Sequence, residues 1–444
     1  MTKAHSNNYS FEIAIIGGGI LGTSIAYWLS TLYKGGQIAV IEKENRVAPH
    51  TSGRNTGVIH RPFYLDPQKK KKFAQATQIS YELWKTYARI KKLPWNEVGT
   101  LEIAFDADQV KTLEKYKKFS LENGMRDDEA EILTPDQIKK IEPNVKCAGA
   151  ILCKTDTAVD YGLFTENLKQ DAEANGVRFI FSNEIKNIEE KPNTLALQSS
   201  SGEIIQTQFL INCAGGNSVD IAHMMGAASD LTDLHFRGEY WVIDPSAAHL
   251  AKRNIYSVPR HTEFPFLDPH WIVRWNGQVE IGPSAVPITD PYLYKGILGS
   301  PSMTLRKLFE RPIQNKLKLL INPSFLSLAL GEWKSSLIKK EMARRVQEFI
   351  PDLQVGHLIR RGAAGIRSSV IDNNGNFAKE ALEINGPRSF HILNYNSPGA
   401  TGAPAFGAYI VQKLIKNGIL VKRAINNETI WDFQKTIAQF SQLT

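Results

Sequence analysis

The chain of 444 residues is 42% hydrophobic and 22% charged, with a net charge of +8 and a pI near 9.1. This composition excludes a disordered chain and is typical of a soluble protein with two or three domains. No apolar run approaches the roughly 18 residues that cross a bilayer, and the first ten residues lack the apolar core of a signal peptide. We therefore predict a cytoplasmic location.

Three cysteines, Cys147, Cys153 and Cys213, are an odd number and too few for a disulfide framework. We expect them to be buried thiols in a reducing compartment. The sequence holds no C-x-x-C pair, and we predict no metal site.

The first predicted elements form a dinucleotide-binding unit. An apolar run at residues 11–16 predicts a buried strand, and Gly17, Gly19 and Gly22 follow in a G-x-G-x-x-G pattern that opens a helix. These glycines allow a tight turn, a close approach to a pyrophosphate at the helix N-terminus, and close packing of helix on strand. A second strand, QIAVIEKE, reaches Glu42, whose carboxylate suits a ribose 2′-hydroxyl and disfavours a 2′-phosphate.

The stretch TSGRNTGVIHRPFY (51–64) follows this second strand. Its hydroxylic residues, its glycines and the pair Arg54-Asn55 suit a cofactor that extends beyond its pyrophosphate, which favours FAD over NAD. A helix is then predicted over residues 68–92, from apolar residues at helical spacing. Strand-like stretches at 101–105, 238–243, 271–275 and 279–283 predict a second sheet above the substrate.

Motifs distributed along the whole chain carry a resemblance to a known family. They are TSGRNTGVIH (51–60), ILTPDQIKKIEPNV (132–145), TAVDYGLFTENLKQDAEANGVRF (157–179), FLINCAGGNSVDIA (209–222), FRGEYWVI (236–243), FPFLDPHWIVRWNGQVEIGPSAV (264–286), GIRSSVIDNNG (365–375) and NSPGATGAPAFG (396–407). With them the chain resembles the FAD-dependent oxidoreductases of the D-amino-acid oxidase / glycine oxidase superfamily, most closely the L-2-hydroxyglutarate dehydrogenase (oxidase) branch.

Two places depart from that branch. After GVIH the branch usually continues with small residues and paired tyrosines, whereas this chain reads Arg61-Pro62-Phe63-Tyr64. Ser369 stands where a glutamine is common. We expect both places to face the substrate.

The resemblance implies a fold of mixed α/β and α+β class. A Rossmann-like FAD-binding domain is interleaved with a substrate domain built on a mostly antiparallel sheet. We assign residues 1–95, 160–235 and 356–444 to the FAD-binding domain. Residues 96–159 and 236–355 form the substrate domain, with a basic helical segment at about 303–345.

The resemblance also implies FAD, which we expect to be non-covalent. The loop NSPGATG opens a helix whose N-terminal N–H groups would face the pyrimidine edge of the flavin, and it includes Asn396. The other expected cofactor residues are Gly17, Gly19, Ile20, Leu21, Gly22, Glu42, Lys43, Thr51, Ser52, Arg54, Asn55, Thr56, Gly57, Ile185, Ala214, Gly215, Gly365, Pro398, Gly399, Ala400 and Thr401.

The implied reaction is oxidation of an L-2-hydroxy acid, with L-2-hydroxyglutarate as best candidate, by hydride transfer to flavin N5. A base must take the hydroxyl proton, and histidine suits this role because it titrates near neutral pH. His60 ends the segment that passes along the cofactor, and it is the first candidate. His270 is the alternative, because it shares a strand face with Arg274.

The substrate carboxylates need cationic partners, and a guanidinium provides two parallel hydrogen bonds. Arg367, in the motif GIR, is one candidate clamp, because related enzymes place an arginine in a comparable motif. Arg274 is another, and Arg61 could hold a second carboxylate. Tyr64 and Tyr240 could hydrogen-bond the substrate or close its pocket.

Other functions stay open at this point. Malate oxidation with a quinone acceptor is close to the first hypothesis, and oxidation of an amino acid or secondary amine fits the same fold. A non-catalytic flavoprotein is the third alternative. The sequence does not give the electron acceptor; the two candidates are a quinone and oxygen.

The basic segment raises the question of a partner. Residues 303–345 hold ten Lys/Arg against three Asp/Glu, which is seven of the eight net positive charges, together with the apolar runs LKLLI and FLSLAL. This pattern suits peripheral contact with the inner face of an anionic membrane. The alternative is a solvated helical subdomain with its apolar side packed inward. Without a nucleic-acid-binding motif, we predict no nucleic-acid partner.

Overall fold

The computed structural model describes residues 9–33, 37–260, 263–265, 268–296, 299–421 and 429–442. The expectation about a signal peptide falls partly on residues 1–8, and residues 266 and 267 belong to the motif at 264–286. Both stretches lie outside the described residues.

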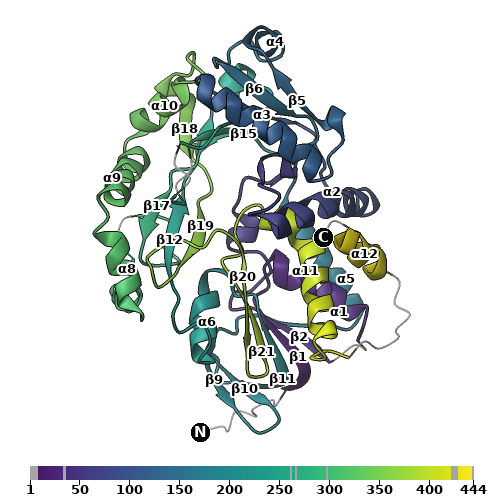
Figure 1. Cartoon of the computed structure of the whole chain (residues 1–444). Helices are drawn as coiled ribbons and strands as arrows, with labels where there is room; N and C mark the ends of the chain where they lie inside the picture. The colour runs from purple at the N-terminus through teal and green to yellow at the C-terminus, as the bar shows by residue number, and fades with distance from the viewer. Residues whose placement is uncertain are drawn as a thin grey trace.

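The first sheet forms the base of the molecule (Figure 1). Its strands are β1 (Tyr9–Ile16), β2 (Ile38–Ile41), β8 (Arg178–Ile180), β9 (Ile185–Glu190), β10 (Leu195–Ser199), β11 (Ile204–Asn212), β20 (Leu382–Gly386) and β21 (Ser389–Leu393). The order is β20-β21-β11-β1-β2-β8, and β1 pairs in parallel with β2 and β11. Because both faces of β1 and β2 are covered, these strands are almost continuously apolar, as parallel strands usually are.

Helices pack together beside this sheet. They are α1 (Ile20–Ser30), α2 (Lys71–Lys91), α5 (Tyr161–Ala174), α11 (Gly399–Lys416) and α12 (Phe433–Gln442). Their shared core includes the buried indoles Trp28, Trp84 and Trp431. Helix α6 (Ser218–Met224) follows β11, near the hairpin of β9 and β10 (Figure 1).

A second sheet of eight strands lies at the other end of the molecule. Its order is β18 (Leu358–Arg361), β13 (Trp241–Ile243), β16 (Val279–Gly282), β15 (His270–Val273), β14 (Asn254–Ser257), β4 (Thr100–Ala104), β6 (Gly149–Cys153) and β5 (Ala130–Leu133). Every neighbouring pair except β14–β4 is antiparallel. Helices α3 (Ala107–Glu122) and α4 (Pro135–Ile141) pack on it. The predicted fold class, a Rossmann-like domain with a mostly antiparallel second sheet, is confirmed.

Two smaller sheets join these parts. One consists of β17 (Val286–Ile288), β12 (Thr232–Gly238) and β19 (Gly365–Ile371), and the other pairs β3 (Val58–Ile59) with β7 (Thr157–Ala158). Strand β18 pairs with β13 of the second sheet, although we assigned residues 356–444 to the FAD-binding domain. On this pairing, the boundary at 356 is better placed after Arg361; the other domain limits remain predictions.

The basic segment is helical. It contains α7 (Pro301–Leu308), α8 (Ile313–Leu320), α9 (Pro323–Leu337) and α10 (Lys339–Gln347). Helices α8 and α9 run along the outer edge beside β12 and β17, and α10 packs against the second sheet near β18 (Figure 1). Among the described residues, no helix is both long enough and apolar enough to span a bilayer. The three cysteines are free thiols; Cys153 and Cys213 are buried, and Cys147 is half-buried.

Candidate active site

The glycine turn after β1 fits a dinucleotide. Gly17 has a φ of +111°, and a Cβ there would lie 2.3 Å from the Cys213 carbonyl oxygen. A Cβ on Gly22 would lie 2.0 Å from the Gly17 carbonyl oxygen. Among the described residues, a Cβ on Gly19 would meet only the Ser52 hydroxyl, at 3.1 Å. The first and third glycines therefore close the turn, and the second leaves its outer side open to a ligand.

We expect Gly22→Ala to lose FAD. The added methyl group meets backbone, which cannot rotate away, so α1 must move off β1 and carry its N-terminus out of place. The purified variant should lack flavin absorbance and unfold at a lower temperature. Gly216→Ala is the matched control, because its Cβ would meet only His235, at an ordinary 3.6 Å. A Gly22→Ala protein that stays yellow would contradict this reading of the turn.

Glu42 is positioned by backbone groups beside this turn. It follows β2, is 5% exposed, and accepts hydrogen bonds from the N–H groups of Gly18 (2.8 Å) and Glu44 (2.9 Å). Burial raises the pKa of Glu42, while these two N–H groups oppose that shift. The carboxylate therefore stands where a dinucleotide places its ribose.

The N-terminus of α1 suits the pyrophosphate. The Ile20 N–H donates to the Ser52 hydroxyl at 2.9 Å. Leu21 and Gly22 occupy the first turn, where N–H groups have no acceptors within the helix. These N–H groups and the helix dipole favour an anion at this position.

The segment from Thr51 to Gly57 is fixed against the neighbouring chain. The Thr51 hydroxyl donates to the Ile366 carbonyl at 2.7 Å, and Asn55 bonds to the carbonyls of Thr51 and Ser52 and to the Gly57 N–H. A Cβ on Gly57, which has a φ of +71°, would lie 2.5 Å from the Val159 carbonyl oxygen. A Cβ on Gly365 would lie 2.1 Å from the Arg54 carbonyl oxygen. The glycines let this segment pass close to Val159 and to strand β19 without displacing either.

The other expected cofactor residues divide into two groups. Ala214 and Gly215 follow β11 in the loop next to Gly17, so they lie with the turn. Three side chains are occupied elsewhere: Lys43 pairs with Glu44 over the Tyr292 ring, Arg54 stacks on the Tyr294 ring, and Ile185 is buried in the core of the first sheet. For these three, only the backbone is available to a cofactor.

Helix α11 brings its first turn to His60. The Thr401 hydroxyl accepts from the His60 N–H at 3.1 Å and hydrogen-bonds the Tyr161 hydroxyl at 2.8 Å. Thr401 is 1% exposed, so its side chain serves the protein rather than a ligand. Pro398 caps this helix, and the Gly399 N–H donates to the Asn396 carbonyl. The N–H groups of Ala400 and Thr401 have no acceptors within the helix and are the ones suited to a flavin.

A cluster of rings lies between these loops and the second sheet. The rings of Tyr256 and His270 have centroids 4.0 Å apart, and the His60 ring lies 5.6 Å from Tyr256 and 6.1 Å from Tyr64. His60 follows β3, whereas Tyr256 and His270 project from β14 and β15. Both candidate bases are therefore in one place, and His270 faces inward.

His60 has the partner that a general base needs. Its Nδ1 lies 3.2 Å from Oδ2 of Asp156, a carboxylate with no exposed surface. The other Asp156 oxygen accepts from the Arg61 N–H at 2.8 Å, which fixes the carboxylate. A carboxylate on Nδ1 leaves Nε2 to accept a proton, as in other oriented histidine bases.

His270 is in a different environment. Burial lowers its pKa to about 3, with smaller contributions from His60, Arg345 and Arg367. Its Nδ1 is buried and makes no hydrogen bond within the described part of the chain. An imidazole with such a low pKa is a weak base at neutral pH, but it remains a good neutral hydrogen-bond donor. The geometry therefore favours His60 as the base.

The neutral state of His270 makes stability depend on pH. The folded pKa of about 3 lies below the unfolded value of 6.5, so the unfolded chain binds an extra proton between these pH values. The free energy of unfolding should therefore fall as the pH drops below 6.5. When the pH is lowered from 6.5 to 5, the free energy of unfolding should fall by about 2 kcal/mol more in the native protein than in His270→Gln. Urea unfolding with saturating FAD measures both proteins. Equal losses in the two proteins would contradict a neutral buried His270.

Arg367 is the one predicted clamp without a protein partner. Within the described residues its guanidinium makes no hydrogen bond or ion pair. The Arg367 side chain is half-buried, and burial lowers its pKa. Both properties are expected of a side chain that lines a buried site. Tyr240 and Tyr64 lie near enough to favour its charge. An unpaired buried cation is costly, so this position suits an anionic ligand.

The other two predicted clamps are already occupied. Arg61 is 2% exposed and binds both carboxylate oxygens of Glu129, at 2.9 and 3.2 Å. Arg274 binds Glu280 and donates to the Asn55 carbonyl. We therefore remove both arginines from the expected substrate contacts. Arg61 ties the chain after β3 to the turn before β5, and Arg274 supports the 51–57 segment.

Three residues near the site were missed in the sequence. Asp156 lies one residue before the motif at 157–179, and Tyr256 lies in the strand NIYS, where alternation could have placed it beside His270. Burial and then the charge of Asp156 raise the pKa of Glu102 to about 8, which favours the protonated form of this buried carboxyl. Two places in the sequence differ from the pattern of the resembled branch. At the first, Tyr64 joins the ring cluster and Phe63 is buried; at the second, Ser369 is buried.

The site combines a glycine turn with an acidic residue after the second strand. A cluster of histidine, arginine and tyrosine lies next to them, beneath an antiparallel sheet. Together these features define a flavin-dependent oxidoreductase. The profile of the DAO family, described as FAD dependent oxidoreductase, matches residues 12–413. This chain belongs to that family, and its cofactor is FAD.

Relatives and solved structures agree with this assignment. The chain is 31% identical to "L-2-hydroxyglutarate dehydrogenase, mitochondrial" of Caenorhabditis elegans, over 91% of this chain and 93% of that protein. It is 29% identical to "L-2-hydroxyglutarate dehydrogenase" of Escherichia coli strain K12, over 91% and 93% of the two chains. Its fold is similar to an L-alpha-glycerophosphate oxidase from Mycoplasma pneumoniae with FAD bound, with a TM-score of 0.72 and 20% identity over 94% and 97% of the two chains. A glycine oxidase from Geobacillus kaustophilus gives 0.66, at 14% identity over 95% and 100%.

Proposed function

We propose that this protein oxidises L-2-hydroxyglutarate to 2-oxoglutarate. The names of the relatives support the substrate, and their similarity extends over nine tenths of the chain. The observation that carries the proposal is the unpaired Arg367 in the same cluster as the His60–Asp156 pair. A cation for the carboxylate and a base for the hydroxyl are the two groups that a 2-hydroxy acid requires.

Each residue has a defined task in this proposal. Arg367 binds the C1 carboxylate through two parallel hydrogen bonds. His60 accepts the C2 hydroxyl proton at Nε2, while Asp156 holds its Nδ1 and stabilises the resulting imidazolium. FAD, when bound, supplies the acceptor for the C2 hydride. The rings of Tyr64, Tyr256 and His270 exclude water from the reacting carbon.

The second carboxylate needs its own donors, and the structure offers two. The buried His270 Nδ1 has no hydrogen-bond partner within the described residues. The buried Tyr256 hydroxyl makes no hydrogen bond of standard geometry there, although the Thr56 side chain lies near enough to interact with it. Buried polar groups are rarely left unpaired, so these atoms indicate a ligand. We propose that they replace Arg61 as the contacts of the C5 carboxylate, while Tyr240 stays beside Arg367.

The electron acceptor and the location form the finer part of the proposal. We propose a quinone rather than oxygen, reached by peripheral contact of residues 303–345 with the inner face of a membrane. The support is the exposure of apolar side chains on α7, α8 and α9, which the alternative of inward packing does not predict.

Product analysis tests the substrate. Purified protein with FAD and a soluble artificial acceptor should convert L-2-hydroxyglutarate to 2-oxoglutarate, identified by mass spectrometry. D-2-hydroxyglutarate is the stereochemical control, and L-malate, with a shorter chain, should react more slowly. Faster turnover of L-malate would reassign the substrate to the shorter diacid.

A further inference from the structure

Exposed apolar side chains are concentrated on helices α7, α8 and α9 and on the residue that follows each of them. Seventeen large hydrophobic residues of the described chain are exposed, and ten of them lie between residues 305 and 338. They form what we call the apolar patch: Leu305, Leu308, Phe309, Leu317, Leu320, Ile321, Leu326, Leu330, Leu337 and Ile338. Leu330 is 70% and Ile321 75% exposed, so the patch is not the margin of a packed core.

The exposed charged side chains within this stretch of the chain are cationic. Between residues 301 and 340 the exposed charged side chains are Arg306, Arg311, Lys318, Lys334 and Lys340. The two carboxylates of the same stretch are not free: Glu310 binds Lys307 and Lys316, and Glu332 binds Arg345. Arg306 pairs with Asp220 and Lys334 with Glu341. Arg311, Lys318 and Lys340 have no carboxylate partner among the described residues, so these three cations suit anionic headgroups.

A cavity lies beneath the patch. It has a volume of about 330 Å³ and lies between β12, β17 and helices α7 to α9. Five patch residues, Leu308, Leu317, Leu320, Leu326 and Leu330, also line it. The cavity therefore opens within the patch, and its walls are mostly aliphatic and aromatic. Such a shape suits an apolar chain that enters from the patch side.

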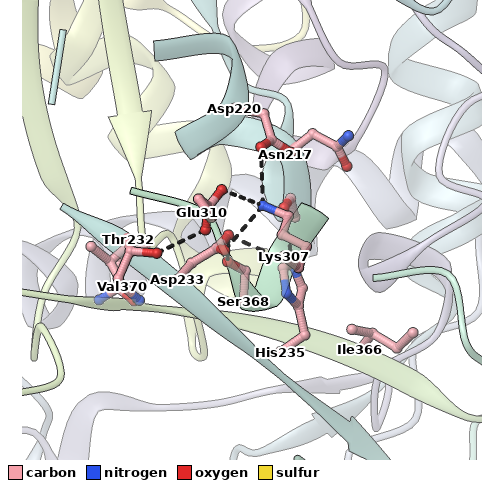
Figure 2. A network of polar contacts seen from close by, with 12 residues as sticks. Asn217, Asp220, Thr232, Asp233, His235, Lys307, Glu310, Ile366, Ser368 and Val370 are labelled. Atoms are coloured by element: carbon pink, nitrogen blue, oxygen red, sulfur yellow. Dashed lines mark hydrogen bonds and ion pairs between the residues drawn. The ribbon is translucent and has the colours of Figure 1, made fainter. Parts of the chain in front are cut away.

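The inner end of the cavity carries no net charge. Lys307 lies 3.1 Å from Asp220, 3.2 Å from Asp233 and 2.9 Å from Glu310 (Figure 2). Lys316 binds Glu310 and Arg306 binds Asp220, so three cations balance three carboxylates.

The remaining titratable group at this floor is His235. Burial lowers the pKa of His235, which favours its neutral form. A ligand that reaches the floor finds every charge already paired. The inner part of the ligand is therefore apolar, and a charged group would remain outside with the basic side chains.

We propose that this cavity binds one acyl chain of an anionic bilayer lipid while the apolar patch lies at the headgroup boundary. The inference rests on the proposed peripheral membrane contact and extends it, because it gives the contact a ligand site. The cavity holds the chain, and the exposed basic residues meet the headgroups.

Trp333 provides the test, because it lines the cavity. The holoenzyme is mixed with phosphatidylglycerol vesicles whose acyl chains carry bromine, a contact quencher of indole fluorescence. The Trp333 contribution is the difference in emission between the native protein and Trp333→Phe. We expect brominated vesicles to remove most of this contribution, and neutral phosphatidylcholine vesicles to bind the protein at least about tenfold more weakly.

Ala329→Phe separates the cavity from the patch. Ala329 is 9% exposed and lines the cavity, so the larger ring fills the space without changing the patch surface. We expect this variant to sediment with the vesicles and to reduce its flavin normally, while its Trp333 emission escapes quenching.

Three results would overturn the proposal. The first is sedimentation of the native protein without Trp333 quenching. The second is quenching by a free brominated fatty acid together with no binding to vesicles, which would make the ligand soluble. The third is a stable dimer in solution that shields Trp333. Flavin reduction by the hydroxy acid is measured separately, so none of these results is confused with failure of the proposed reaction.

Discussion

Arg367→Lys should lower kcat/KM for L-2-hydroxyglutarate by about 10- to 100-fold, because losing one charge-assisted hydrogen bond costs about 1.5–3 kcal/mol. Lysine keeps the positive charge but loses the second parallel hydrogen bond to a carboxylate. FAD should remain bound, since no cofactor contact is assigned to the Arg367 side chain. Steady-state kinetics with a soluble acceptor, per mole of bound flavin, measure the effect.

Arg61→Lys is the matched control for this experiment. Arg61 is also buried, but its guanidinium serves Glu129, Gln78 and Thr155. We expect this variant to unfold at a lower temperature while its folded fraction keeps most of its kcat/KM. Normal kinetics in Arg367→Lys, together with a large loss in Arg61→Lys, would return Arg61 to the substrate site and remove Arg367.

His60→Ala should lower kcat by about 10²- to 10⁴-fold, the range in which general bases contribute. The variant should retain FAD, because the His60 contact with α11 uses its backbone N–H. Added imidazole should restore part of the activity, since it can occupy the vacated space and accept the proton. His270→Ala should behave differently, with its main effect on KM and no rescue by imidazole.

Asp156→Asn adds a second test of the same assignment. The amide can hold His60 but cannot stabilise an imidazolium, so kcat should fall while KM changes little. If His60→Ala turns over normally and imidazole rescues only His270→Ala, the base is His270.

Much of the FAD-binding fold could be predicted because its determinants are local in sequence. The glycines, the apolar strand and Glu42 lie within about thirty residues, and each is required by backbone geometry. The placement of β18 could not be predicted, because its pairing with β13 joins segments more than a hundred residues apart.

The candidate site was predicted less completely because its side chains compete for partners across the chain. Nothing near Arg61 in sequence reveals Glu129, which is 68 residues away. The Arg274–Glu280 pair could have been predicted from the sequence. The residues WNGQ between them are a hairpin signal, and a hairpin brings the two side chains close together. The alternation of side chains along β15 could not show which face of the strand points into the protein. The contact of the His270 ring with the Tyr256 ring shows that His270 lies on the inner face.

The basic segment shows how a charge count can mislead. The segment holds ten Lys/Arg, but Lys307 is buried among Asp233 of β12, Asp220 of α6 and Glu310, which follows α7 (Figure 2). Lys316 is buried against Glu310 as well. What remains exposed is a smaller basic rim around an apolar patch. The packing of α7 to α9, and not the charge count, shows which cations are buried and which are exposed.

Anaerobic flavin reduction tests the central claim most directly. The purified holoenzyme is titrated without oxygen or any other acceptor, and the visible absorbance of oxidised FAD is followed. We predict that L-2-hydroxyglutarate bleaches the flavin completely, whereas D-2-hydroxyglutarate, glycine, sarcosine and proline leave it oxidised. Bleaching by an amine in place of the hydroxy acid, or an unchanged spectrum with L-2-hydroxyglutarate, would contradict the assignment of this site to a 2-hydroxy diacid.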